Sequence, residues 1–198
     1  MQRLVVGMTG STGAIFGVRL LEALAETDVE THLVVSKWAQ QTVEHETSLT
    51  LNDLRALATE TYSASDMGAK VSSGSFHTDG MVVVPCSMRT VAAIAHGNGD
   101  HLVHRAADVI LKERRKLVVV ARETPLSDIH LENLLKLSRM GVTVLPPMPA
   151  FYNLPKSLDD MVNHIVMRIL DQFEISRDLV KRWDGKMRNR GQRIRPIK

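Results

Sequence analysis

Cysteine and aromatic residues are scarce in this sequence. Cys86 is the only cysteine, so the chain cannot form an internal disulfide, as is typical of proteins in a reducing compartment. Aromatic residues make up only 4% of the chain whereas methionine occurs 10 times, so aliphatic and thioether side chains must fill the core. A hydrophobic fraction of 44% in 198 residues is ordinary for one globular domain.

Long apolar runs are also absent. No stretch approaches the roughly 20 apolar residues that a membrane-spanning helix requires. The apolar run Leu4-Val5-Val6 is too short for the core of a signal peptide, and no small-residue cleavage site follows it. We therefore expect a cytoplasmic protein without a membrane partner.

The net charge of +3 hides an uneven distribution of basic residues. Residues 177–198 contain nine Lys or Arg and only two Asp, which leaves 16 basic and 20 acidic residues in the rest of the chain. A basic tail is compatible with nucleic-acid contact, with docking on a neighbouring subunit or with a solvated segment. Trp183 is the only aromatic residue in the tail that could stack on a base, so we do not expect a nucleic-acid partner.

Short apolar strands alternate with amphipathic helices along the chain. The pattern predicts strands at 4–8, 29–35, 81–84, 117–121 and 142–145, and helices at 15–25, 37–47, 51–58, 91–95, 102–113, 131–138 and 158–173. The helix at 51–58 is expected to be capped by Asn52, and residues 60–79 are expected to be irregular with one short strand near Val71. Strands that are apolar on both faces indicate a mostly parallel, doubly wound α/β sheet of the Rossmann-like or flavodoxin-like kind. We place one domain at 1–175 and a basic tail at 176–198.

Unusual residues follow several predicted strands directly. The segments at 9–13, 36, 85–90 and 122–126 all do so, and ligands of such sheets bind beyond the carboxyl ends of the strands. The loop Gly10-Ser11-Thr12-Gly13 precedes a helix and suits a phosphate, although such a turn also serves tight packing. Ser87-Met88-Arg89-Thr90 combines hydroxyl groups, a cation and a helix start, which suits an anion; a capped helix with a solvated Arg89 is the alternative.

The first loop is not the dinucleotide fingerprint, which requires G-x-G-x-x-G and an acidic residue after the second strand. Ser36 occupies that acidic position and is followed by Lys37, and no Walker A sequence is present. A mononucleotide with one phosphate is therefore favoured over NAD or ATP. Cys86 has no flanking histidine and is interpreted as a small buried residue rather than a nucleophile.

Taken together, these motifs resemble the UbiX/Pad family of flavin prenyltransferases over residues 1–175. The motifs that carry the resemblance are Met8-Thr9-Gly10-Ser11-Thr12-Gly13-Ala14, Val35-Ser36-Lys37, Ser73-Gly74-Ser75-Phe76, Pro85-Cys86-Ser87-Met88-Arg89-Thr90, Arg105-Ala106-Ala107-Asp108-Val109, Leu111-Lys112-Glu113-Arg114-Arg115, Arg122-Glu123-Thr124-Pro125-Leu126, Ile129-His130-Leu131-Glu132-Asn133 and Pro149-Ala150-Phe151-Tyr152. The first loop departs from the family's common Gly-Ala-Ser-Gly, but Thr12 keeps a hydroxyl group.

The resemblance implies an enzyme that alkylates reduced FMN, at N5 and then C6, with a dimethylallyl group from dimethylallyl phosphate and without a metal. It also implies a homododecamer built from trimers, whose product passes to a UbiD-type aromatic acid decarboxylase. The implied FMN-binding residues are Gly10, Ser11, Thr12, Ser36, Ser87, Met88, Arg89, Thr90 and Arg122. Those for the substrate phosphate are Lys112, Arg122, Tyr152 and Arg168, and the implied catalytic residues are Glu123, Thr12 and Glu46.

Several alternatives remain open at this point. Glu46 and Lys112 could be solvated helix residues, and Arg122-Glu123 could be a surface ion pair. The chain could instead be an FMN-dependent decarboxylase of the cysteine or aromatic acid type, or a non-catalytic FMN carrier. His96, His101 and His104 lack the partners of a zinc site, so no metal is expected.

Overall fold

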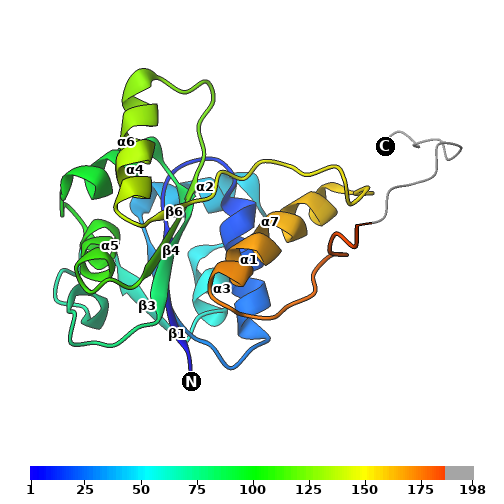
Figure 1. Cartoon of the computed structure of the whole chain (residues 1–198). Helices are drawn as coiled ribbons and strands as arrows, with labels where there is room; N and C mark the ends of the chain where they lie inside the picture. The colour runs from blue at the N-terminus through cyan, green and yellow to red at the C-terminus, as the bar shows by residue number, and fades with distance from the viewer. Residues whose placement is uncertain (186–198) are drawn as a thin grey trace, which may run out of the picture.

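Six parallel strands form one sheet in the computed structural model, which describes residues 1–185 (Figure 1). The strands are β1 (Arg3–Met8), β2 (Glu30–Val35), β3 (Glu60–Ser63), β4 (Gly80–Cys86), β5 (Lys116–Ala121) and β6 (Thr143–Val144). They lie in the order β3-β2-β1-β4-β5-β6, so the direction of winding reverses between β1 and β4. This is the doubly wound topology predicted from the sequence, and its ligand crevice is expected outside the carboxyl ends of β1 and β4.

Helices cover both faces of the sheet. One face packs against α1 (Ala14–Ala25), α2 (Lys37–Glu46), α3 (Leu51–Ala56) and α7 (Leu158–Gln172). The other packs against α4 (Met88–His96), α5 (Leu102–Lys112), α6 (Asp128–Arg139) and the short 3₁₀ turn η1 (Lys70–Ser72). The α-helices and five of the strands lie where the sequence pattern places them, with shifted ends.

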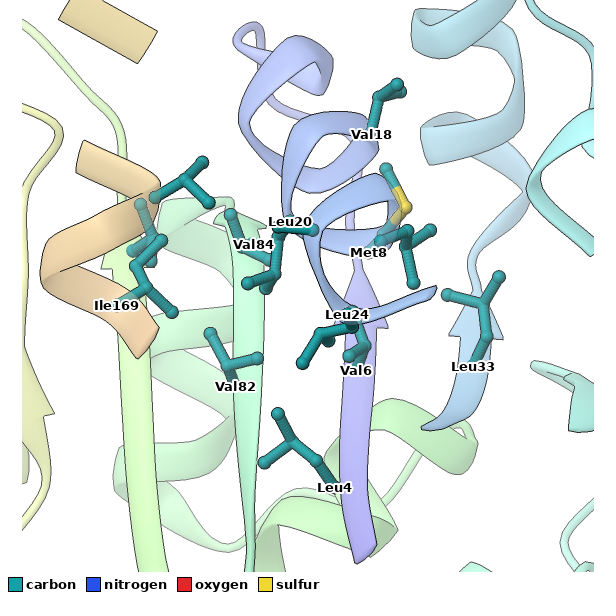
Figure 2. Close-up of a cluster of buried hydrophobic side chains, with 14 of the residues drawn as sticks. Leu4, Val6, Met8, Val18, Leu20, Leu24, Leu33, Val82, Val84 and Ile169 are labelled. Carbon is teal, nitrogen blue, oxygen red and sulfur yellow. The ribbon is translucent and has the colours of Figure 1, made fainter. Parts of the chain in front are cut away.

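Alternating side chains along each central strand divide the core in two. Leu4, Val6 and Met8 of β1 pack under α1, where Leu20 and Leu24 are fully buried (Figure 2). The intervening strand positions point to the opposite face and pack against α4 and α5. Because both faces are covered, the central strands contain almost only aliphatic residues, and this is the pattern that predicts a parallel sheet.

Two details of the segment between β2 and β4 differ from the prediction. The segment 60–79 contains the edge strand β3 at its start, and Val71 lies in η1 rather than in a strand. Threonine at position 61 and the tyrosine after it carry this strand, whose half-polar composition reflects its place at the sheet edge. The cap of α3 is Thr50, whose hydroxyl accepts from the Asp53 amide, so the prediction of Asn52 is wrong by two residues.

The segment after α7 returns along the domain. Arg177 pairs with Glu26, the residue after α1, and Arg182 pairs with Asp171 at 2.9 Å. The described part of the predicted basic tail therefore packs on its own chain, and Lys186, Arg188, Arg190, Arg193, Arg195 and Lys198 lie outside the described residues. Within residues 1–185, no helix is long and apolar enough to cross a bilayer.

Candidate functional site

A cleft of about 580 Å³ opens at the carboxyl ends of β1, β2 and β4, where the winding reverses. It brings together five residues predicted to bind FMN, namely Gly10, Ser36, Ser87, Arg89 and Thr90. The rest of its lining is Thr9, Lys37, Trp38, Ala64, Ser65, Asp100 and His101. The predicted loops therefore meet at one site although they are up to 80 residues apart in the sequence.

One buried hydroxyl group joins the two central loops of this cleft. Oγ1 of Thr9 donates to the carbonyl of Pro85 at 2.9 Å and accepts from the amide of Ser87 at 2.8 Å. Thr9 is 3% exposed, so both bonds are shielded from water. They fix the spacing between the loop after β1 and the loop after β4.

Two helices begin at the cleft with serine caps. Oγ of Ser36 accepts from the amide of Ala39 at 3.1 Å at the start of α2. Oγ of Ser87 accepts from the amide of Thr90 at 3.3 Å at the start of α4. Helix N-termini carry partial positive charge and free N–H groups, so with the Arg89 side chain this end of the cleft suits a phosphate. Met88 is buried and is not among the residues that line the cleft.

The first glycine-containing loop passes very close to α2. A Cβ on Gly10 would lie 2.4 Å from Cβ of Trp38, so only glycine fits between the loop and the helix. Oγ of Ser11 is buried and has no hydrogen-bond partner, which leaves a polar atom for a ligand at this point. Thr12 is exposed beside it. The loop thus packs tightly on α2 and lines the cleft through Gly10, whereas Ser11 and Thr12 are not among the lining residues.

Glu46, the last residue of α2, sits at the start of α1. Its carboxylate accepts from the amides of Gly13 and Ala14, both at 2.9 Å. The side chain therefore has a fixed place next to Thr12 and is not the freely solvated helix residue that composition alone allows. Two of the three predicted catalytic residues are adjacent.

Arg122 and Glu123 follow β5, one strand further along the same edge of the sheet. The amide of Arg122 donates to the carbonyl of Cys86 at 3.1 Å, which ties this loop to the end of β4. The exposed Glu123 carboxylate accepts from the amide of Thr124 at 3.0 Å. Among the described residues, the lining of the cleft includes neither Arg122 nor Glu123, so they border the site rather than form its wall.

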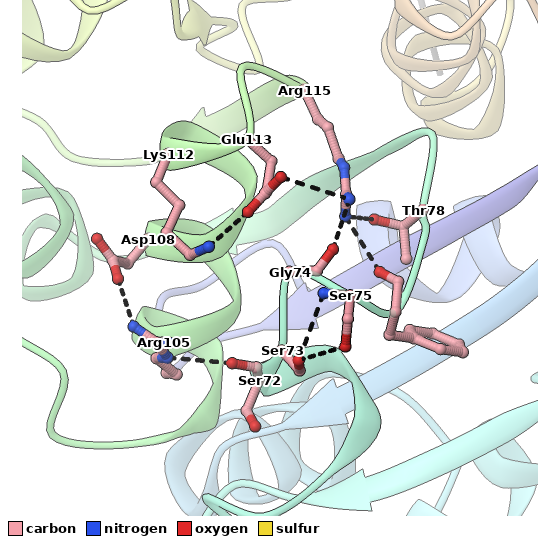
Figure 3. A network of polar contacts seen from close by, with 11 residues as sticks. Ser72, Ser73, Gly74, Ser75, Thr78, Arg105, Asp108, Lys112, Glu113 and Arg115 are labelled. Carbon is pink, nitrogen blue, oxygen red and sulfur yellow. Dashed lines mark hydrogen bonds and ion pairs between the residues drawn. The ribbon is translucent and has the colours of Figure 1, made fainter.

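Lys112 lies at the opposite end of the sheet, near the amino ends of the strands. It ends α5, which runs back from the cleft toward the amino ends of the strands, and its Nζ is 2.5 Å from the Glu113 carboxylate (Figure 3). A Cβ on Gly74 would come within 2.7 Å of this Nζ, so the lysine packs against the loop before β4. Within one chain, Lys112 is therefore not brought together with Arg122.

Tyr152 contacts α7, the helix that carries Arg168. The hydroxyl group of Tyr152 lies 3.5 Å from Nε2 of His164, and Arg168 is one helical turn further along. Burial and then the charge of Arg168 lower the pKa of His164. Trp183 stacks edge-on against Tyr152 at 5.6 Å. These residues form a half-exposed cluster of one cation and three aromatic rings.

Several residues of the cleft have no signal in the sequence. Ala64 and Ser65 follow β3, the strand that the sequence does not reveal, and Asp100 and His101 precede α5. Trp38 is 68% exposed although it borders the cleft. Cys86 is fully buried, and burial raises the pKa of its thiol, in agreement with its interpretation as a core residue. Among residues 1–185, no three His, Cys, Asp or Glu side chains are grouped to hold a metal.

Comparisons with known proteins fit this geometry. The flavoprotein family model matches residues 1–170. A probable UbiX-like flavin prenyltransferase of Bacillus subtilis is 61% identical over 189 residues, covering 96% of this chain and 93% of the relative. The dodecameric FMN-dependent UbiX-like decarboxylase of Escherichia coli O157:H7 is 59% identical with a TM-score of 0.92, covering 93% of this chain and all of that structure.

A second solved structure contains ligands. It is AnUbiX (PadA1) in complex with FMN and dimethylallyl pyrophosphate, 52% identical with a TM-score of 0.92 over 94% of this chain and 99% of that one. The match extends over sheet, cleft loops and helices alike. The chain therefore belongs to the flavoprotein family and, within it, to the UbiX-like flavin prenyltransferases.

Proposed function

We propose that this chain transfers a dimethylallyl group to reduced FMN. The observation that carries the proposal is the cleft at the carboxyl ends of β1 and β4, where two capped helix N-termini and Arg89 face a closely approaching glycine loop. A relative of the same fold, 52% identical, is solved with FMN and dimethylallyl pyrophosphate bound.

The FMN phosphate is assigned to the end of the cleft formed by Ser36 and Ser87 to Thr90. Backbone N–H groups and hydroxyls there complement its charge. The isoalloxazine ring then lies along Gly10 to Thr12, where Ser11 has a buried hydroxyl without a partner. Thr12 is assigned a hydrogen bond at N5, and Arg122 is assigned to the ring from the neighbouring loop.

The prenyl donor is a phosphate ester, and its charge needs a separate set of cations. The carbon–oxygen bond to phosphate breaks as the bond from the allylic carbon to N5 forms, so negative charge grows on the departing phosphate. Lys112, Arg122, Tyr152 and Arg168 are assigned to this group. A preorganised contact to such developing charge typically lowers the activation free energy by about 3–4 kcal/mol.

Glu123 and Glu46 are the assigned proton-transfer groups. N5 loses its proton as the leaving phosphate gains one from Glu123. Closure of the new ring then adds a proton to the prenyl double bond while C6 loses one to a carboxylate. Glu46 is held by two amide hydrogen bonds next to Thr12, so its carboxylate is oriented before any substrate binds.

The distribution of these residues implies a homo-oligomeric enzyme. Lys112 lies near the amino ends of the strands, whereas Glu123 lies at their carboxyl ends. Lys112 therefore reaches a prenyl phosphate only in the site of another copy. A relative 59% identical is a dodecamer, and we assign a dodecamer, built from trimers, to this chain. The product, prenylated FMN, is suited to a UbiD-type decarboxylase as its acceptor.

Mass spectrometry of the flavin tests the proposed function. Purified protein incubated anaerobically with reduced FMN and dimethylallyl phosphate is expected to yield a flavin heavier by one C5 unit. Dimethylallyl pyrophosphate, supplied in a parallel reaction, reports the donor preference. A flavin that keeps its mass with both donors, although FMN is bound, contradicts the transfer and favours a flavin carrier.

The same preparation separates the competing decarboxylases. An aromatic acid added without a prenyl donor should not release carbon dioxide. Cysteine-type chemistry is disfavoured by the burial of the only thiol, Cys86, in the middle of the sheet. Release of carbon dioxide in this assay would assign the cleft to decarboxylation.

A further inference from the structure

Two histidines at the start of α5 stand beside the cleft and have no role in the proposed chemistry. His101 lines the cleft, and its ring stacks on that of His104 with centroids 3.7 Å apart and an angle of 32°. His104 is 2% exposed, and neither of its ring nitrogens has a hydrogen-bond partner. Nδ1 of His101 is buried and unpartnered as well, so the pair carries three unsatisfied nitrogens.

Unsatisfied buried nitrogens are costly, and their position here has a consequence. Buried polar groups without partners are rare and destabilise a fold, so a pair of such rings beside the cleft calls for an explanation. His101 is the N-cap of α5, which makes this the third helix to begin at the cleft after α2 and α4. His101 and Arg89 line the same cleft, and the charge of Arg89 acts on the His101 ring.

We propose that His101 is a further phosphate-binding residue of this cleft, with His104 as a positioning residue behind it, so that FMN binding takes up a proton. The proposal rests on the proposed function, since it takes FMN as the ligand. Nε2–H of His101 donates to a phosphate oxygen, and the bound anion favours the imidazolium form of the ring. The stacked His104 fixes the plane of the ring, and its aromatic face accommodates the charge.

The surroundings keep both rings neutral until the anion arrives. Burial and then the charge of Arg89 on α4 lower the pKa of His101, against a smaller opposite effect of Asp100. Burial and then His101 lower the pKa of His104 to about 4. Lys37 of α2 adds a further cation to the cleft, and the loop packed against α5 contributes the uncharged Ala64 and Ser65. A phosphate reverses the balance at His101, the ring that reaches the cleft.

The sign of the pH dependence follows from this proton uptake. Affinity for FMN is expected to rise as the pH falls from 8.5 to 6.5, by up to about tenfold per pH unit for one linked proton. The phosphate group by itself loses charge over this range and would weaken binding. The two effects have opposite signs, so the observed slope identifies the histidine.

Titration of the full-length protein with FMN and with riboflavin, each without prenyl donor, tests the proposal. For His101→Asn we expect an FMN Kd raised about five- to tenfold at pH 6.5, loss of the pH slope, and less than a twofold change for riboflavin, which has no phosphate. Asparagine is a good N-cap, so α5 should keep its start. His77→Asn changes an exposed histidine before β4 and is the matched control, expected to behave as wild type.

Two further variants sharpen the result. His101→Lys carries a permanent charge and is expected to bind FMN tightly at pH 8.5 with no slope. His104→Leu keeps the volume but removes the aromatic face, and is expected to halve the slope or more. An unchanged slope in His101→Asn, or an equal loss of FMN and riboflavin binding, overturns the proposal for His101; an unchanged slope in His104→Leu removes His104 from it. Failure of wild type to bind any flavin contradicts the proposed function instead.

Discussion

The carboxylate of Glu123 is the group assigned to protonate the leaving phosphate. Replacement by glutamine keeps its size and its contact with Thr124 but removes the ability to donate a proton. We expect Glu123→Gln to lower the rate of prenyl transfer by about 10²- to 10⁴-fold while the FMN Kd stays within twofold, because general acid–base groups contribute on that scale. Single-turnover mass spectrometry measures the rate, and the exposed Glu132→Gln on α6 serves as control. A wild-type rate would remove Glu123 from the mechanism.

His104 allows a prediction about stability and pH. Its folded-state pKa of about 4 lies below the ordinary value near 6.5, so the unfolded chain binds the proton more readily. The contribution of neutral His104 is therefore complete above pH 6.5 and is lost as the pH falls toward 4. His104→Leu should raise the melting temperature at pH 7 by roughly 2–6 °C, because two unsatisfied nitrogens leave the core.

Thermal unfolding between pH 5 and 7 checks this prediction. The difference between His104→Leu and wild type should widen on acidification, whereas the exposed His77→Leu should follow wild type throughout. A variant that is less stable than wild type at pH 7 would mean that the histidine nitrogens have partners in solution.

At the level of secondary structure, the start of α1 depends on a residue from another helix. Gly13 takes the N-cap position with φ 96° and supplies no side-chain hydrogen bond. Glu46 of α2 satisfies two amides there, a favourable place for a carboxylate beside the positive end of a helix. This contact links the two helices on either side of the Gly10 loop.

Glu46→Gln separates the structural from the catalytic role of this contact. Because the amide side chain can still accept hydrogen bonds, the free energy of unfolding should fall by only about 0.3–1 kcal/mol. Turnover is expected to fall at least tenfold if the carboxylate also acts on the flavin beside Thr12. Denaturant unfolding and flavin mass spectrometry are measured on the same preparation, and a loss of activity in proportion to unfolded protein would leave only the structural role.

Element by element, sequence pattern predicts the buried part of this fold best. The strands β1, β4 and β5 are short apolar runs, and their loops could be assigned to one edge because parallel strands end together. β3 escapes prediction because an edge strand alternates polar and apolar residues weakly, and with it go Ala64 and Ser65 of the cleft. The pairing of His101 with His104 depends on a helix start that periodicity locates only approximately.

At the scale of the whole molecule, the residues assigned to one reaction lie at both ends of the strands of one sheet. If Lys112 serves the site of a neighbouring copy, variants that are inactive alone should complement each other. We expect Lys112→Ala and Glu123→Gln each to form little prenylated flavin, and their co-assembly to restore a measurable fraction, since some sites then receive both wild-type residues. Co-expression with two affinity tags isolates the mixed oligomers. In the control, Lys116→Ala takes the place of Lys112→Ala. If the mixed oligomers of Lys112→Ala and Glu123→Gln recover no activity, Lys112 lies outside the site.

The hydroxyl group of Thr9 also determines which part of the crevice can give way. It bridges the loops after β1 and β4 through two short, buried hydrogen bonds, so the distance between these loops at the bottom of the cleft is fixed. The parts of the cleft that can move to admit a flavin are then the exposed indole of Trp38 and the turn at Ala64 and Ser65. The fixed spacing of the two loops then limits the size of the ligand, and the mobility of the two sides of the cleft sets the rates at which it binds and dissociates.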